Sequence, residues 1–104
     1  MAIDSEYLYV ADNDDVLWAI HRQSGQVKWK QAALKARAIT SPVLMGNRLV
    51  VGDKTGLLHV LSTADGEFIG REQLSGPILI DPAVTSNKIY VVSANGRLNR
   101  LTIR

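Results

Sequence analysis

The histidines His21 and His59 are the residues of this 104-residue sequence best suited to acid–base catalysis or metal binding. An imidazole exchanges protons near neutral pH and binds Zn²⁺, but either function needs further ligands or a nucleophile beside it. Ser62, Ser75 and Ser93 have no nearby histidine in a nucleophile-like context. We therefore interpret both histidines as strand residues with a solvated or hydrogen-bonded ring, and we predict no catalytic residue and no metal site.

The acidic segment Asp12-Asn13-Asp14-Asp15 has the side-chain types that bind Ca²⁺. It lacks the glycine and the distal glutamate of an EF-hand loop, and the repeat described next places Lys54 at the position of Asn13. We interpret it as a turn. The glycines at 52, 56 and 66 separate strands and open no helix, so the sequence predicts neither a phosphate-binding loop nor any cofactor.

A threefold repeat organises the chain around these residues. Residues 8–12 (LYVAD) recur as residues 49–53 (LVVGD) and 89–93 (IYVVS), at offsets of 41 and 40 residues. In this register His59 corresponds to Trp18 and Asn99, whereas His21 corresponds to Ser62. Short apolar strands and glycine turns that repeat about every 40 residues are typical of β-propeller blades.

The sequence therefore predicts an all-β fold in one partial propeller domain, residues 1–104, with about two and a half four-stranded antiparallel blades. Residues 3–34 form a blade lacking its inner strand, residues 35–75 a complete blade, and residues 76–104 a blade lacking its outer strand. The expected strands are residues 6–11, 16–21, 26–31, 39–44, 48–52, 57–62, 67–74, 78–84, 88–92 and 97–103. Residues 31–38 have a helix-friendly composition, but there we expect a loop or a single helical turn.

Composition excludes several classes of protein. A net charge of +2 is too small to indicate nucleic-acid binding, and the absence of cysteine excludes disulfides and thiolate sites. No apolar run approaches the roughly 18 residues that a membrane-spanning helix needs. The first residues lack the profile of a signal peptide and run almost directly into a strand, so we expect a segment of a longer chain.

The segment from Ala19 to Trp29 (AIHRQSGQVKW) resembles the tryptophan-docking motif of PQQ-type propellers, although His21 and Gln26 replace the usual aspartate and lysine. In that motif the glycine, here Gly25, makes a turn and the tryptophan packs against the neighbouring blade. The middle repeat has Gly70 in place of the tryptophan. The residues expected to maintain the blades are Gly25, Trp29, Gly56, Gly66 and Gly96.

Residues 40–44 and 46–53, Gly56, residues 65–66 and the ending at residues 95–104 resemble the C-terminal blades of the BamB family, and the resemblance covers residues 3–104. It implies an eight-bladed parent propeller that is a non-catalytic scaffold of the outer-membrane β-barrel assembly machinery (the BAM complex) and a partner of BamA. It also implies a location on the periplasmic face of the outer membrane, through a lipid anchor that this sequence does not contain. The family's contact with BamA involves loops of earlier blades, so no partner-binding residue is assigned here.

Two alternatives stay open at this point: a fragment of a PQQ-dependent quinoprotein dehydrogenase, and a fragment of a propeller sensor domain. The first would require calcium and quinone ligands, and the second a membrane-spanning segment upstream. We further expect the chain either to associate with a second copy of itself or to fold as a truncated propeller wedge of low stability, because incomplete terminal blades leave apolar faces and strand edges uncovered.

Overall fold

The computed structural model describes residues 1–74 and 76–102, and these residues form eleven β-strands and no helix. The strands are β1 (Ala2–Ile3), β2 (Tyr7–Ala11), β3 (Leu17–His21), β4 (Val27–Gln31), β5 (Val43–Met45), β6 (Arg48–Gly52), β7 (Leu57–Ser62), β8 (Phe68–Gln73), β9 (Ala83–Val84), β10 (Lys88–Val92) and β11 (Leu98–Thr102). The expectation of an all-β fold is confirmed.

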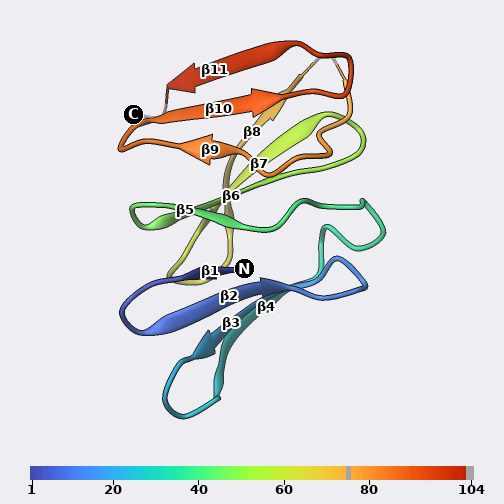
Figure 1. The fold of residues 1–104 in the computed structure, drawn as a ribbon. Helices are drawn as coiled ribbons and strands as arrows, with labels where there is room; N and C mark the ends of the chain where they lie inside the picture. Colours follow the sequence, from blue (N-terminus) through green and yellow to red (C-terminus); the bar gives the residue numbers. More distant parts are fainter. Residues whose placement is uncertain (75, 103–104) are drawn as a thin grey trace.

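The strands form three antiparallel sheets that lie one above another in chain order (Figure 1). We call them the first sheet (β1-β2-β3-β4), the second sheet (β5-β6-β7-β8) and the third sheet (β9-β10-β11). This open stack is a partial propeller, as the repeat predicts, because each sheet is one repeat of consecutive antiparallel strands. The third sheet has three strands among the described residues.

The first sheet corrects one prediction. The blade at residues 3–34 does not lack its inner strand: Ala2 and Ile3 pair with Tyr9 and Leu8 to form β1. A strand of two residues is too short to show the alternation that identifies a strand in a sequence. The blade limits at residues 34/35 and 75/76 stay predictions, and residue 75 lies outside the described residues.

The inner strands of the other two sheets are shorter than expected. Residues 39–44 and 78–84 were each predicted as a strand, but only β5 and β9 form, directly after Pro42 and Pro82. Proline has no N–H to donate to a sheet, so it belongs at the start of a strand or before it. Residues 31–38 contain turns rather than a helix, with positive φ at Ala36 (65°) and Ala38 (53°).

Two apolar cores hold the stack together. Tyr9, Leu17 and Trp29 of the first sheet pack with Leu49 and Leu61 of the second. The opposite side of the second sheet packs on the third, with Val50, Leu58, Val60, Ile89 and Val91 in the second core. Alternate strand residues point to opposite faces of a sheet, so the second sheet supplies both cores.

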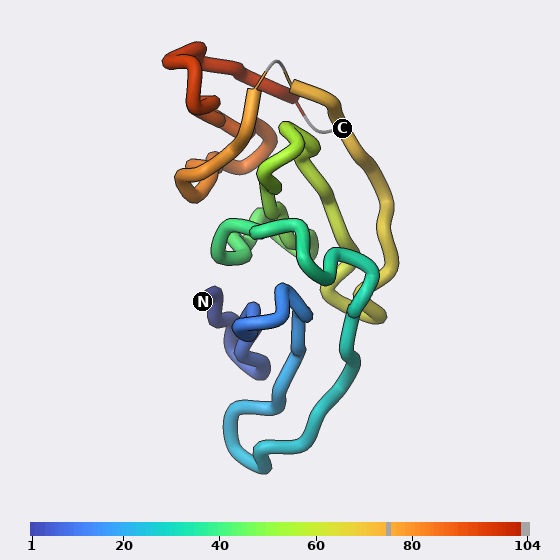
Figure 2. The backbone as a smooth tube through the Cα atoms, turned by 90° about the vertical axis from the view of Figure 1, so that its right-hand side faces the viewer, coloured from blue at the N-terminus to red at the C-terminus, as the bar shows by residue number. Residues whose placement is uncertain are grey.

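The view turned by 90° shows the three repeats following one another along a curved stack (Figure 2). The crossover from the first to the second sheet is fixed by backbone bonds: Thr40 N donates to Gly52 O (2.9 Å) and Lys54 N donates to Arg37 O (3.1 Å). Within residues 1–74 and 76–102, no helix is long and apolar enough to cross a membrane.

Candidate functional site

A carboxylate follows the second strand of each of the first two sheets and binds a ring nitrogen six residues later. Trp18 Nε1 donates to Asp12 Oδ2 and His59 Nε2 donates to Asp53 Oδ2, both at 2.8 Å. The two pairs lie 41 residues apart, at equivalent positions of the repeat. Sequence analysis aligned His59 with Trp18 but missed the shared carboxylate partner, although an aspartate six residues upstream is present in both repeats.

The pair in the second sheet is buried: Asp53 is 0% exposed and His59 1%. The Asp53 carboxylate also accepts from Thr55 Oγ1 (2.6 Å) and from the backbone N–H groups of Thr55 and Leu57, and Arg37 Nη1 lies 3.6 Å away. Every Asp53 oxygen therefore has a donor, which is what a buried charge needs to be tolerated.

Burial and hydrogen bonding act in opposite directions on these two groups. Burial alone would raise the pKa of Asp53, but the hydrogen bonds from His59, Thr55 and the backbone outweigh it and lower that pKa. Burial lowers the pKa of His59, and the nearby Asp53 carboxylate offsets only part of this effect. The pair is therefore a carboxylate bound to a neutral imidazole.

This geometry fits a structural tie better than a catalytic group. The imidazole is enclosed between sheets and packs edge-on against Phe68, with the two ring centroids 5.7 Å apart. It therefore has no access to a substrate. His59 Nδ1 is buried without a hydrogen-bond partner among the described residues. The tie fixes the β6–β7 turn to the strand that follows it.

Ser62 and Ser93, which the sequence analysis did not accept as nucleophiles, make hydrogen bonds within turns. Ser62 Oγ accepts from Ala64 N (3.2 Å), and the buried Ser93 donates to Asn95 Oδ1 (2.5 Å). Ser75 lies outside the described residues. In the described part of the chain, no group of three or more His, Cys, Asp or Glu side chains is arranged to hold a metal ion.

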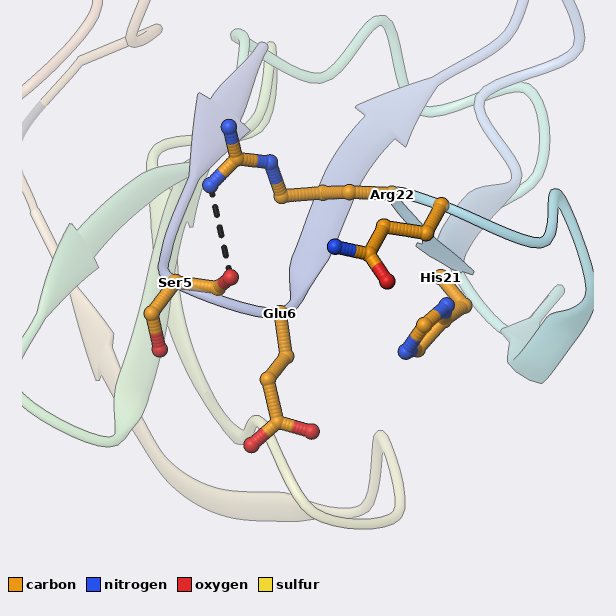
Figure 3. Close-up of a pocket in the computed structure, with 5 residues that line it drawn as sticks. Ser5, Glu6, His21 and Arg22 are labelled. Atoms are coloured by element: carbon orange, nitrogen blue, oxygen red, sulfur yellow. Dashed lines mark hydrogen bonds between the residues drawn. The ribbon is translucent and has the colours of Figure 1, made fainter.

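A shallow hollow of about 470 Å³ lies where the β1–β2 turn meets the β3–β4 turn (Figure 3). Its lining includes Ser5, Glu6, His21, Arg22 and Gln23. Arg22 Nη1 donates to the Ser5 carbonyl (3.3 Å), while the Glu6 carboxylate points away from the guanidinium (Figure 3). His21 Nδ1 lies 3.1 Å from Ser24 Oγ. These contacts hold two turns together, and the polar groups do not converge on one point.

The acidic segment at residues 12–15 is a turn that binds the backbone. Asp12 Oδ1 accepts from Asp14 N (2.8 Å) and Val16 N (3.1 Å). Asp15, with φ of 62°, accepts from Ala38 N (3.2 Å) and Ile39 N (3.1 Å), so its carboxylate ties the first sheet to the crossover.

Trp29 joins the first two sheets. Its Nε1 donates to the Thr63 carbonyl (2.8 Å) at the β7–β8 turn. Its ring lies against Gly66, and its ring centroid is 6.2 Å from that of Tyr9. The motif glycines occupy turns with positive φ: Gly25 74°, Gly56 90°, Gly66 74° and Gly96 83°. Trp18 lies on the side of the first sheet that faces away from the second, under the Lys30 ammonium.

Outer strands present free edges. β4 and β8 end their sheets, and five of the six residues of β8 are exposed, among them Ile69. An unpaired strand edge is a template for another extended segment. These edges and the turns are among the parts of the described chain that a protein partner can reach.

Comparison with known proteins gives one consistent result. The sequence model of a family described as "Outer membrane protein assembly factor BamB" matches residues 31–104. The protein of that name from Legionella pneumophila (strain Paris) is 50% identical over 103 residues, which are 99% of this chain and 27% of the relative. Its counterpart in Escherichia coli (strain K12) is 31% identical over 101 residues, 96% of this chain and 26% of the relative.

Solved structures agree with this match. The crystal structure of BamB from Moraxella catarrhalis superposes with a TM-score of 0.88 and 28% identity, covering 97% of this chain and 30% of that one. The computationally designed Ika4 protein superposes with a TM-score of 0.84 at 14% identity, covering 99% of this chain and 64% of that one, and shows the fold alone. The chain spans about a quarter of the length of the curated relatives that it matches.

Proposed function

The chain belongs to the BamB family of outer membrane protein assembly factors, and from this membership we propose that it is part of a non-catalytic scaffold in the machinery that assembles β-barrel proteins in the outer membrane. The observation that carries the proposal is the 50% identity over 99% of the chain to a protein with that name. Neither a quinoprotein dehydrogenase nor a sensor is favoured by this match.

The structure supports a scaffold in physical terms. Its polar side chains are used to fix turns and crossovers: Asp53 holds its own hairpin, Asp15 holds the crossover, and Trp29 holds the next sheet. Such ties make a rigid stack that presents turns and the β4 and β8 edges to other proteins. Binding through these surfaces is the mechanism that we propose.

The remaining parts of the proposal concern the whole protein. We propose an eight-bladed parent propeller, on the periplasmic face of the outer membrane, held by a lipid anchor outside this sequence. We further propose that the parent binds BamA within the BAM complex, and that an outer strand from elsewhere in the parent completes the third sheet. The family resemblance supports each of these statements.

A chimera tests the role directly. The matched region of the Escherichia coli relative, 101 aligned residues, is replaced with residues 1–104 and the gene is expressed in cells that lack their own copy. The proposal predicts recovery of outer-membrane β-barrel protein levels and co-purification of the chimera with BamA. A control from which the matched region is deleted, with no replacement, should restore neither.

Fold and function are separated by two further measurements on the chimera. Limited proteolysis reports whether the propeller is folded, and membrane fractionation reports whether it reaches the outer membrane. A chimera that is folded and correctly placed, yet restores no β-barrel protein, contradicts the proposed role of this region.

A further inference from the structure

β8 is the outermost strand of a complete four-stranded sheet, so one of its edges has no strand beside it. The second sheet packs between the first and the third, and β8 runs along the outer side of the curved stack (yellow in Figure 2). Five of its six residues are exposed. The open edge is therefore a property of a complete sheet at the perimeter, not of the ends of the sequence.

The backbone groups that point to this edge follow from the hydrogen bonds of the sheet. Leu74 N donates to Gly56 O (2.8 Å), which sets the phase of the ladder between β7 and β8. In an antiparallel pair, residues that exchange hydrogen bonds alternate with residues that do not. Counting back from Leu74 in the observed register, residues 72 and 70 bond to β7, whereas Arg71 and Gln73 direct their N–H and C=O groups to the open edge.

The side chains next to these groups differ in kind at successive positions. The pairing with β7 shifts register between Val60 and Leu61, so the regular ladder of β8 begins at Gly70. Gly70 has no side chain, and only Val60 lies within 4 Å of a Cβ built there. Arg71 and Glu72 follow, both exposed and of opposite charge. The edge thus offers a gap, a cation and an anion in order.

The outer strand of the first sheet is protected in a way that β8 is not. β4 carries the exposed residues Lys28 and Lys30, whose ammonium groups lie over aromatic rings of the same sheet. Lysines on an edge strand oppose pairing with another strand. The equivalent residues of β8, 41 positions later, are Ile69 and Arg71. Ile69 is 54% exposed, so the first of the two cations is replaced by an apolar side chain.

We propose that β8 binds an extended segment of another protein as a fifth, antiparallel strand, in which a basic, an acidic and an aromatic residue follow one another and lie opposite Glu72, Arg71 and Gly70. Opposite charges that face each other across two strands stabilise the pairing. An aromatic side chain covers the backbone that a glycine in a strand leaves bare. This inference rests on the proposed scaffold role and names the segment that one of its edges takes.

Hydrogen exchange in the chimera described above tests the pairing, because the chimera supplies a neighbour on both sides of the stack. The probe is the peptide Ser-Val-Thr-Lys-Glu-Tyr-Thr-Ser, whose tyrosine lies opposite Gly70 in the proposed register. Exchange is read at single residues by fragmentation mass spectrometry. With peptide, the amides of Arg71 and Gln73 should exchange severalfold more slowly, whereas those of residues 70 and 72 should be unchanged because β7 already binds them. A peptide with its lysine and glutamate exchanged should protect less.

Three variants separate the backbone from the side chain. Arg71→Pro removes one outward N–H, at a position where an edge strand tolerates proline, and should abolish the protection of Gln73. Arg71→Thr keeps the N–H and removes the charge, so it should weaken binding but leave the alternating pattern. Lys30→Pro, at the equivalent position of β4, is the matched control and should bind like the unmodified chimera. Limited proteolysis of each variant shows that the propeller is folded.

Other results would overturn the inference. These are exchange at Arg71 and Gln73 that no peptide concentration slows, protection that Arg71→Pro leaves intact, and protection on β4 that Lys30→Pro removes. The scaffold role is judged separately: a chimera that restores β-barrel protein levels but binds no peptide keeps that role and excludes strand addition at β8. A chimera that binds the peptide but restores nothing supports strand addition and contradicts the role.

Discussion

Trp29 and Gly66 lie in different sheets and are in direct contact: a Cβ added to Gly66 would lie 2.5 Å from Cε3 of the Trp29 ring. The Nε1 atom of the same ring donates to the carbonyl of Thr63, in the turn that contains Gly66. The first and second sheets thus meet where the Trp29 indole covers Gly66, the residue of that turn that has no side chain. Gly66 is needed there for two separate reasons, its positive φ and the space that Trp29 occupies.

These two reasons can be separated by comparing Gly66→Ala with Gly25→Ala. Both glycines have φ of 74°, but nothing lies within 4 Å of a Cβ at Gly25. Gly25→Ala should lower the free energy of unfolding by about 1–2 kcal/mol, the backbone cost alone. Gly66→Ala should lose roughly 1–3 kcal/mol more because Trp29 must move. Urea unfolding measures both, and equal losses would contradict the contact.

Trp29 itself should contribute more to stability than Trp18. Trp29→Ala removes a buried ring between two sheets and should cost about 3–5 kcal/mol. Trp29→Phe keeps most of the ring but leaves the Thr63 carbonyl without its donor, a loss of about 1 kcal/mol. Trp18→Ala, on the side of the first sheet that faces away from the second sheet, is the control. Urea titrations followed by circular dichroism rank the variants; a loss for Trp18→Ala as large as that for Trp29→Ala would refute the assignment.

Asp15 should stabilise the crossover between the first two sheets. Asp15→Ala removes the acceptor of the Ala38 and Ile39 amides and should cost about 1–2 kcal/mol. Amide hydrogen exchange at those two residues should accelerate. Asp14→Ala, which removes an exposed carboxylate of the same turn, is the matched control and should leave exchange there unchanged. Unaltered protection of both amides in Asp15→Ala would argue against the tie.

The His59–Asp53 pair predicts a pH dependence of stability. The pKa of His59 is lowered by burial, so the unfolded chain binds a proton near its ordinary pKa of 6.5 while the folded chain stays neutral. The contribution of this group is therefore fully present above pH 6.5 and is lost as the pH falls toward the folded pKa, by up to about 1.4 kcal/mol per pH unit. The pKa of Asp53 is also lowered, which keeps this carboxylate ionised across that window.

His59→Asn tests this directly, since asparagine stands at the equivalent position of the third repeat, Asn99. The variant should be less stable than wild type at neutral pH, and its stability should change less between pH 7 and pH 5. His21→Asn, at the surface hollow, is the control for removing a histidine that does not belong to the pair. Parallel curves of unfolding free energy against pH for wild type and His59→Asn would show that the pair does not titrate as described.

Much of the fold follows from the sequence because the repeat constrains it three times. The bounds of β6, β7 and β10 agree with those predicted, since each strand is bracketed by a turn with glycine, asparagine or aspartate. β1 could not be predicted, because two residues carry no periodic pattern and only pairing with Leu8 and Tyr9 makes them a strand. The partner of His59 was also missed, although the spacing of six residues from an aspartate recurs in the first repeat.

The sequence by itself determined the blades, their turns and the alternation that gives each sheet two apolar faces. Only the tertiary structure decided which of those faces are covered. Asp12–Trp18 and Asp53–His59 are the same local motif, made by the same turn at the same spacing. The second pair is buried and the first is more exposed because, among the described residues, the second sheet has a neighbouring sheet on each side and the first sheet has one. Local propensity specifies a hairpin, but burial depends on what packs against it, and that is a property of the stack.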